Sequence, residues 1–231
     1  MPFGASRAGL MSVAVDDIPD SKNLQAHFDF SDDSTTTSFV QDRSGNGNDL
    51  ETGSFSGLDV DINGRQAANF NEESDPPRTE ADVGFPLTVY AVIEHTGDTG
   101  NNAGYLNFDD STFRRALRWR RTGEGDETGW NWSWQDGEQT DGNSLPYADD
   151  PVLLTNVISD DGLLRVNQGE DSDVGSASDA NTDTITVGDR GMDNSAPIDA
   201  NIGEILIYGT DHDESIYTDV ENYLADKWGP F

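Results

Sequence analysis

The chain has no cysteine, only two lysines and no long apolar run among its 231 residues. Without cysteine there is no disulfide framework, no thiolate nucleophile and no zinc site built from thiolates. No apolar stretch approaches the roughly 18 residues that a membrane-spanning helix needs. These absences exclude thiol chemistry and predict that the chain has no membrane span.

Positive charge is scarce as well. Thirteen lysines and arginines stand against 45 aspartates and glutamates, which gives a formal net charge of −32. Such a chain repels itself at low salt, and about 1 M salt, which shortens the screening length to about 3 Å, removes most of that repulsion. We interpret the composition as an adaptation to a high-salt environment, as in extreme halophiles. Nucleic acid is disfavoured as a partner, because phosphate binding needs clustered cations.

Aromatic and apolar residues are frequent enough for one hydrophobic core. The chain contains five tryptophans, ten phenylalanines and six tyrosines, which argues against disorder. Residues 24–30 alternate apolar with polar side chains, and residues 87–93 form a continuous run typical of a central strand. Gly, Asn, Asp and Ser separate the further predicted strands, at 114–121, 130–135, 152–158, 163–167, 184–187 and 202–208.

One helix is predicted near the C-terminus. Ile216, Val220 and Leu224 recur every four residues, Asp213 is suited to the N-cap, and Gly229 with the following proline ends the element. Many short strands with a single helix predict an all-β fold, a two-sheet antiparallel jelly-roll sandwich with one short C-terminal helix. We assign residues 23–231 to this domain and expect residues 1–22 to be an arm that attaches it to a larger assembly.

Three segments resemble the concanavalin A-like lectin/glucanase superfamily in its laminin-G-like form. The sequence QDRSGNGNDL at 41–50 is similar to the family's D-x-S-G-N-G-N-D-L turn, and NGRQAANF at 63–70 to its N-G-R-x-A-x-x-F strand. The sequence IGEILIY at 202–208, followed by YLADKWG at 223–229, is similar to the closing strand and helix. The resemblance implies a jelly roll, a fold that hosts lectins, glycosidases and structural modules.

Catalytic residues are not apparent in this pattern. The family's glucanases place two carboxylates on one strand as Glu-x-Asp-x-Glu, whereas the segment at 124–128, EGDET, has Thr at the last position. The three histidines, His27, His95 and His212, have no nucleophile–base motif around them, and we expect structural or surface roles for them. We therefore predict that the chain is not an enzyme.

A calcium site is a second hypothesis. Asp59, Asp61 and Asn63 match the first half of a D-x-D-x-N-G calcium loop, but the twelfth position is Phe70, where a bidentate Glu is required. The same residues suit a β-turn with Asn63 and Gly64 at its tip. We expect no obligatory cofactor and name Ca²⁺ as the one metal ion that this loop, or another site near the sheet rim, could bind.

The ligand-binding hypothesis rests on two strands. Trp130, Trp132 and Trp134 share one face of a strand and could stack on sugar rings, although packing in the core is the competing interpretation. Five arginines fall within residues 114–121, and Arg118 and Arg120 share a face that could receive an anionic glycan. Pairing with acidic loops or with a neighbouring subunit is the alternative.

We therefore expect a non-enzymatic structural or adhesion module on a halophilic virion (head decoration, turret or tail fibre) or in the extracellular space. It would contact host surface glycan or neighbouring subunits, and a homo-oligomer is expected. The assignment to a virion follows from the resemblance, because haloarchaeal tailed viruses carry lectin-like domains. A stand-alone polysaccharide-binding lectin of a haloarchaeon and a glycoside hydrolase with a non-standard site are the two alternatives.

Overall fold

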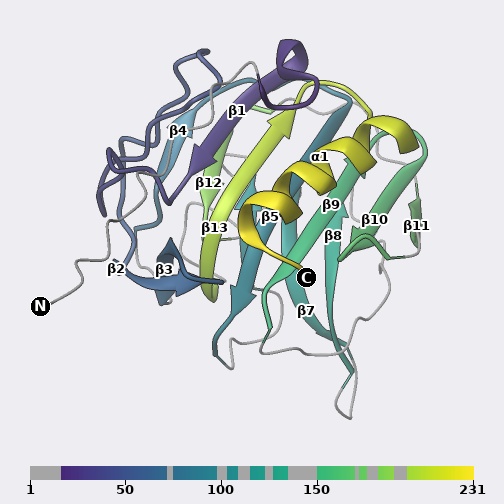
Figure 1. Cartoon of the computed structure of the whole chain (residues 1–231). Helices are drawn as coiled ribbons and strands as arrows, with labels where there is room; N and C mark the ends of the chain where they lie inside the picture. Colours follow the sequence, from purple (N-terminus) through teal and green to yellow (C-terminus); the bar gives the residue numbers. More distant parts are fainter. Residues whose placement is uncertain are drawn as a thin grey trace, which may run out of the picture.

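The computed structural model describes residues 17–71, 75–97, 103–108, 115–122, 127–134, 150–169, 172–175, 182–189 and 197–231. They form strands β1 to β13, the 3-10 helix η2 (Ser21–Asn23) and the α-helix α1 (Glu214–Trp228) (Figure 1). The strands are β1 (Leu24–Asp29), β2 (Gly57–Ile62), β3 (Arg65–Asn71), β4 (Arg78–Glu80), β5 (Leu87–His95), β6 (Gly104–Asn107), β7 (Arg115–Thr122), β8 (Glu127–Trp134), β9 (Val152–Ile158), β10 (Gly162–Val166), β11 (Ser172–Gly175), β12 (Thr184–Val187) and β13 (Asp199–Tyr208).

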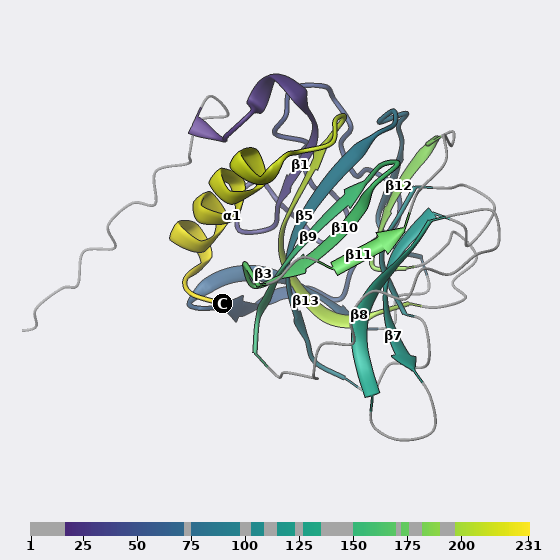
Figure 2. The same cartoon turned by 90° about the vertical axis from the view of Figure 1, so that its right-hand side faces the viewer.

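The strands pair into two antiparallel sheets, which confirms the predicted sandwich. The larger sheet has the order β11-β10-β9-β5-β13-β3-β2, and β1 pairs with β13 beyond the end of β3. The smaller sheet has the order β4-β12-β6-β7-β8. Seen from the side, α1 and the smaller sheet lie on opposite faces of the larger one (Figure 2).

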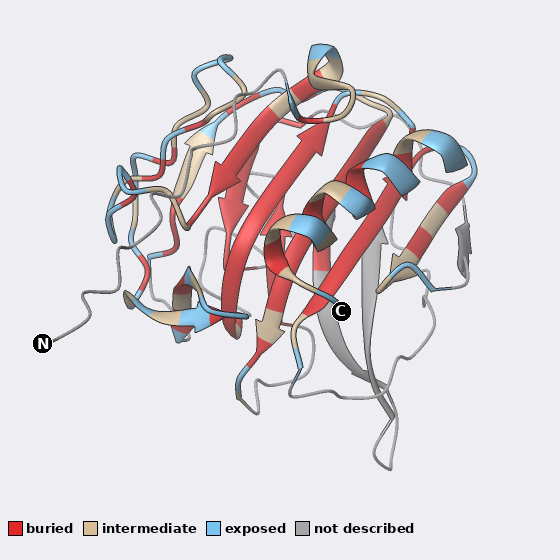
Figure 3. Cartoon of the chain, viewed as in Figure 1, coloured by how far each residue is buried: buried red, intermediate tan, exposed pale blue. Residues whose placement is uncertain are grey.

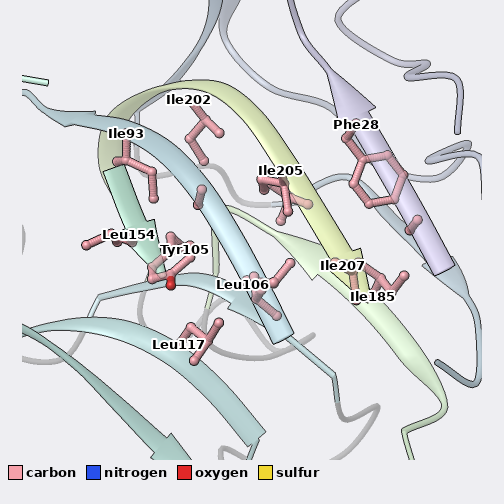
Figure 4. Packing of buried hydrophobic residues seen from close by; sticks show 14 of the residues in the cluster. Phe28, Ile93, Tyr105, Leu106, Leu117, Leu154, Ile185, Ile202, Ile205 and Ile207 are labelled. Carbon is pink, nitrogen blue, oxygen red and sulfur yellow. The ribbon is translucent and has the colours of Figure 1, made fainter. Parts of the chain in front are cut away.

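The central strands β5 and β13 are buried on both faces, which explains their continuous apolar sequences. Val89 and Ile205 belong to the core between the sheets, where Leu106 and Leu117 of the smaller sheet meet them (Figure 4). Tyr90, in alternation with Val89, belongs to a second core beneath α1. Burial on both faces removes the polar alternation expected of a half-exposed strand, and β5 and β13 are buried almost throughout (Figure 3).

Helix α1 has the predicted beginning and end. The side chain of Asp213 accepts hydrogen bonds from the backbone N–H groups of Ser215 and Ile216, at 3.0 and 3.2 Å, and so satisfies donors that a helix leaves free at its start. Val220 and Leu224 are buried against the larger sheet, whereas the opposite face of the helix is exposed (Figure 3). The helix therefore packs by the apolar stripe that the sequence indicated.

The β2–β3 hairpin holds the C-terminal end of α1. Asn63 and Gly64 form its tip with φ of 51° and 80°, the left-handed pair that a two-residue hairpin turn requires. The Asn63 side-chain amide donates to the carbonyl of Trp228 at 2.8 Å, and Arg65 Nε donates to the carbonyl of Lys227. Two of the carbonyl groups left free by the last helical turn are thereby satisfied.

The turn at 41–50 covers the outer edge of β1. The buried Asp42 carboxylate accepts the backbone N–H groups of His27, Ser44 and Asn48, at 2.9–3.0 Å. The Asn46 and Asn48 side-chain amides donate to the backbone carbonyls of Leu24 and Gln25 in β1. The polar side chains of the segment at 41–50 thus hydrogen-bond to the protein's own backbone. They satisfy backbone groups at a strand edge that would otherwise be unpaired.

Residues 17–22, the described end of the predicted arm, lie against the domain. Ile18 is buried in the core beneath α1, and the Pro19 carbonyl accepts a hydrogen bond from the Tyr208 hydroxyl at 3.0 Å. Residues 1–16 lie outside the described part of the chain. Within the described residues, no helix combines the length and hydropathy that crossing a bilayer requires.

Candidate functional site

A cavity of about 600 Å³ lies at one end of the larger sheet, where β5 begins and β9 ends. The β9–β10 turn and the connection from β13 to α1 meet at this end of the sheet (Figure 1). Its apolar wall comes from three separate segments and consists of Phe85, Pro86, Val157 and Ile216. The volume falls within the range of about 300–1,000 Å³ that is typical of small-molecule sites.

The polar wall of this cavity is acidic. It contains Ser159, Asp160 and Asp161 from the β9–β10 turn, and Asp211 and Asp213 from the segment before α1. We call the cavity, with these residues and its apolar wall, the acidic pocket. Among the residues that the structure describes, no lysine or arginine lines it, so the described lining side chains carry negative charge.

The aspartates of the acidic pocket have different roles. Asp213 is the N-cap of α1, and the hydrogen bond from the Ser215 hydroxyl, together with those from the backbone, lowers the pKa of its carboxyl group. Asp160, Asp161 and Asp211 are exposed, and no hydrogen bond or ion pair engages their carboxylates within the described residues. These three carboxylates can therefore accept hydrogen bonds from a ligand.

His212 fixes the floor of the acidic pocket to β5. Its backbone N–H donates to Thr88 Oγ1 at 3.0 Å, and Thr88 Oγ1 donates to the Thr210 carbonyl at 2.8 Å. Its Nδ1 lies 2.8 Å from the Tyr90 hydroxyl, and its Nε2 lies 3.3 Å from the Asp20 carboxylate. Burial lowers the pKa of the His212 ring, and the nearby Asp20 carboxylate opposes this effect.

A second cluster of titratable groups is buried between β1, β13 and α1. The Lys227 ammonium lies 2.7 Å from both the Asp29 and the Glu204 carboxylates. His27 Nε2 and Trp228 Nε1 donate to Glu204, at 2.7 and 2.6 Å. We call these five residues the lysine cluster.

The electrostatics of the lysine cluster differ from those of a catalytic acid. Burial disfavours the charged form of Glu204, but Lys227 and His27 outweigh it and lower the pKa of that carboxyl to about 2. A glycosidase general acid needs the opposite shift, a raised pKa. Glu204 has no exposed side-chain surface and Asp29 only 6 %, so a substrate could not reach this carboxylate pair.

The lysine cluster also contains a set of ligand atoms that could hold a metal ion. The donor atoms of His27, Asp29 and Glu204 lie within 4.8 Å of one another. The ammonium of Lys227 already bridges the two carboxylates, so a metal ion binding both would have to displace it. The cluster is accordingly a buried ion-pair network that joins the first strand of the domain to its last strand and helix.

The two strands predicted to bind ligands are adjacent in the smaller sheet. In the β7–β8 pairing, Trp119 is opposite Trp130 and Arg118 is opposite Asn131. The side chains of Trp130, Trp132, Trp134, Arg118 and Arg120 lie outside the described residues, so the glycan-binding hypothesis at β7 and β8 stays a prediction. The segment at 124–128 also lies outside them, except for the backbone of its last two residues.

The residues of the hypothetical calcium loop occupy the β2–β3 hairpin. Asp59 and Asp61 are exposed on β2, and the Asp61 carboxylate accepts the backbone N–H of Gly64 at 2.9 Å. The Asn63 side chain donates to Trp228, as described above. Two of the three side chains thus contribute to the hairpin and its contact with α1, and calcium binding here stays a prediction.

Sequence reasoning did not find the acidic pocket. Its walls come from segments near residues 85, 160 and 212, and each reads locally as an ordinary loop or strand end. Asp160 and Asp161 come shortly after a predicted strand, but in a chain with 45 acidic residues such a pair is not a specific signal. The one local signal of a functional residue at the pocket is His212, which precedes the helix. All three histidines are buried.

Comparisons with known proteins place the fold. No family model matches the chain, and no curated protein matches it. Domain 4 of AbnA, a GH43 extracellular arabinanase from Geobacillus stearothermophilus, in complex with arabinotriose, is similar with a TM-score of 0.60 and 18 % identity, covering 86 % of this chain and 98 % of that domain.

Two further solved structures match only in part of their length. An arabinofuranosidase complexed with arabinofuranosyl-α-1,2-xylobiose has a TM-score of 0.56 and 16 % identity, over 89 % of this chain and 59 % of that one. Trypanosoma rangeli sialidase in complex with the inhibitor DANA has a TM-score of 0.61 and 10 % identity, over 90 % of this chain and 34 % of the sialidase chain. The chain therefore has the β-sandwich fold found in domains of glycoside hydrolases and sialidases.

Proposed function

We propose that this chain is a non-catalytic carbohydrate-binding domain. The observation that carries the proposal is the fold similarity to an entire domain of an arabinanase, a domain whose structure contains arabinotriose. Because the similarity spans 98 % of that domain, the comparison is with a whole folding unit. Fold alone does not determine function, so the proposal also depends on a site with suitable chemistry.

The acidic pocket has the chemistry that sugar binding requires. A sugar ring has an apolar C–H face and a rim of hydroxyl groups, and the pocket offers an apolar wall that includes Phe85 and Ile216. The carboxylates of Asp160 and Asp161 are acceptors for hydroxyl hydrogens, and hydrogen bonds to ionised acceptors are stronger than neutral ones. The tryptophans of β8 remain the second proposed contact surface.

The absence of catalysis is part of the proposal, and the lysine cluster contains one pair of carboxylates that does not suit a glycosidase. The closest carboxylates in the lysine cluster, Asp29 and Glu204, share Lys227 as their counterion and are buried. A retaining glycosidase needs two accessible carboxyl groups about 5 Å apart, one of them a proton donor. The similarity to sialidases and an arabinofuranosidase keeps a glycoside hydrolase as the second candidate.

Glycan binding and turnover can be tested together in molar KCl. The full chain is applied to immobilised neutral and anionic polysaccharides, arabinan among them, and the same glycans are incubated with it in solution. The proposal predicts retention without release of reducing sugar. Retention on none of the glycans would refute it, and release of reducing ends would establish the glycoside hydrolase instead.

We propose further that the domain acts on an extracellular or virion surface in a high-salt environment, attached through residues 1–22. The acidic composition and the resemblance to lectin-like domains support this step. Mass spectrometry of purified virus particles tests the virion assignment, and absence of the chain from particles would refute it. A haloarchaeal stand-alone lectin would then be the remaining form of the same function.

A further inference from the structure

The acidic pocket differs in charge from a site for an acidic sugar. Asp160, Asp161 and Asp211 line it with exposed carboxylates that have no partner within the described part of the chain, and no cationic side chain is among its described lining residues. The chain as a whole carries a formal charge of −32. A ligand that brings its own carboxylate or sulfate would therefore meet like charge both at contact distance and over the surrounding surface.

High salt changes the balance between repulsion at contact distance and repulsion from the surrounding surface. At about 1 M salt the screening length is about 3 Å, so repulsion from distant surface charges largely disappears. Groups in direct contact inside a partly enclosed cavity are screened much less. Selection between neutral and anionic ligands would thus depend on the few carboxylates that touch the ligand.

The hydrogen-bonding capacity of the pocket also favours a neutral sugar over an anionic one. Ionised carboxylates accept hydrogen bonds and donate none. Sugar hydroxyls are donors as well as acceptors, so a neutral sugar can satisfy Asp160 and Asp161 directly. A ligand carboxylate has only acceptors. Placed against these aspartates, it would leave the hydrogen-bonding capacity of both carboxylates unsatisfied, and the two like charges would repel each other.

We infer that the acidic pocket binds a neutral sugar residue, with Asp160, Asp161 and Asp211 accepting its hydroxyl hydrogens and Phe85 and Ile216 contacting its apolar face. It discriminates against uronic, sialic and sulfated sugars. This inference rests on the proposed function and specifies its ligand class and position. None of the described lining residues belongs to β7 or β8, so the two surfaces can be tested by separate variants.

The test uses calorimetric titration of the full chain in molar KCl with two probes of equal length, neutral arabinotriose and anionic trigalacturonate. The inference predicts that arabinotriose binds at least about tenfold more tightly. In the variant Asp160→Asn/Asp161→Asn, loss of two charged acceptors lowers the affinity for arabinotriose about tenfold or more. In the same variant the ratio of the affinity for arabinotriose to that for trigalacturonate becomes smaller, because the charge that repels trigalacturonate is gone.

The matched control is Asp33→Asn/Asp226→Asn. These two aspartates are exposed, and neither lines the pocket. The control changes the net charge by the same amount, so both affinities should equal those of the unmodified chain. Equal loss in the control and the pocket variant would show a general charge effect and overturn the inference. The variant Ile216→Ala should weaken arabinotriose binding without changing the preference between the probes.

Failure of the inference is distinguishable from failure of the proposed function. Tighter binding of trigalacturonate, or no binding of either probe, overturns the inference while retention on other glycans keeps the proposed function. If Ca²⁺ alone binds and Asp160→Asn/Asp161→Asn abolishes that binding, the pocket is a cation site and the inference is wrong. Retention on no glycan at all refutes the proposed function itself.

Discussion

At the scale of single residues, the two lysines of the chain occupy opposite environments. Lys227 bridges Asp29 and Glu204 with only 9 % of its side chain exposed. Lys22 makes a 3.5 Å ion pair with Asp20 and has 80 % of its side chain exposed. Buried charges depend on their partners much more strongly than exposed ones do. The chain therefore contains its own matched pair for measuring the ionic contribution to stability.

We predict that Lys227→Met destabilises the fold by about 3 kcal/mol, because it leaves the buried Glu204 carboxylate without its lysine and Asp29 with Arg43 as its remaining cation. Lys22→Met, the control, should change stability by less than about 0.5 kcal/mol. Denaturant unfolding in molar KCl measures both. Equal effects of the two substitutions would contradict the assignment of the lysine cluster as a structural ion-pair network.

Glu204 makes stability dependent on pH. Its pKa is lowered to about 2 in the folded chain, from 4.5 for an unperturbed glutamate. The unfolded state therefore binds the proton first as the pH falls, and the contribution of Glu204 is complete above about 4.5 and lost towards about 2. Glu204→Gln should be clearly less stable than the unmodified chain at neutral pH.

The stability difference between the unmodified chain and Glu204→Gln should shrink as the pH falls through this window. Unfolding midpoints at about pH 7 and about pH 3 measure the effect. A difference that does not change between these pH values would show that Glu204 is not held ionised by Lys227 and His27.

At the scale of elements, the docking of α1 depends on a glycine. A Cβ atom at Gly203 would lie 2.8 Å from carbon atoms of the Trp228 ring, closer than such atoms approach. The ring cannot easily shift, because its Nε1 donates to Glu204 at 2.6 Å and the side chain is buried. The close approach of β13 and the last turn of α1 therefore requires glycine at this position.

We predict that Gly203→Ala destabilises the chain by about 1–3 kcal/mol through overpacking. Gly57→Ala is the control, because a Cβ there meets only the flexible end of Asp59. Thermal unfolding in molar KCl compares the two. Combined with Trp228→Leu, Gly203→Ala should cost less than the sum of the single effects, since the clash is then relieved; additive effects would contradict this explanation.

Local patterns predicted most elements, and long-range partners account for what they missed. The predicted strands at 152–158 and 184–187 have the observed bounds of β9 and β12, and α1 begins after Asp213 as expected. These features depend on neighbours in sequence. The pairing of Lys227 with Glu204 and Asp29 depends on contacts between distant segments, and 45 acidic residues give no local sign of which ones it selects.

At the scale of the whole molecule, salt should control stability. The formal charge of −32 is what remains after all 13 lysines and arginines are set against the 45 aspartates and glutamates. We predict that the unfolding midpoint rises as KCl increases from about 0.1 M to about 1 M, where the screening length falls from about 10 to about 3 Å. A midpoint independent of KCl, measured by circular dichroism, would contradict the high-salt interpretation.

Binding of a neutral sugar in the acidic pocket can be observed residue by residue. The most direct test is NMR chemical-shift mapping of the isotope-labelled full chain in molar KCl during titration with arabinotriose. We expect saturable shifts of backbone amides at 157–161 and 211–216, next to Asp160, Asp161 and Asp211. Shifts confined to β7 and β8, or no saturable shift with this sugar, would contradict it.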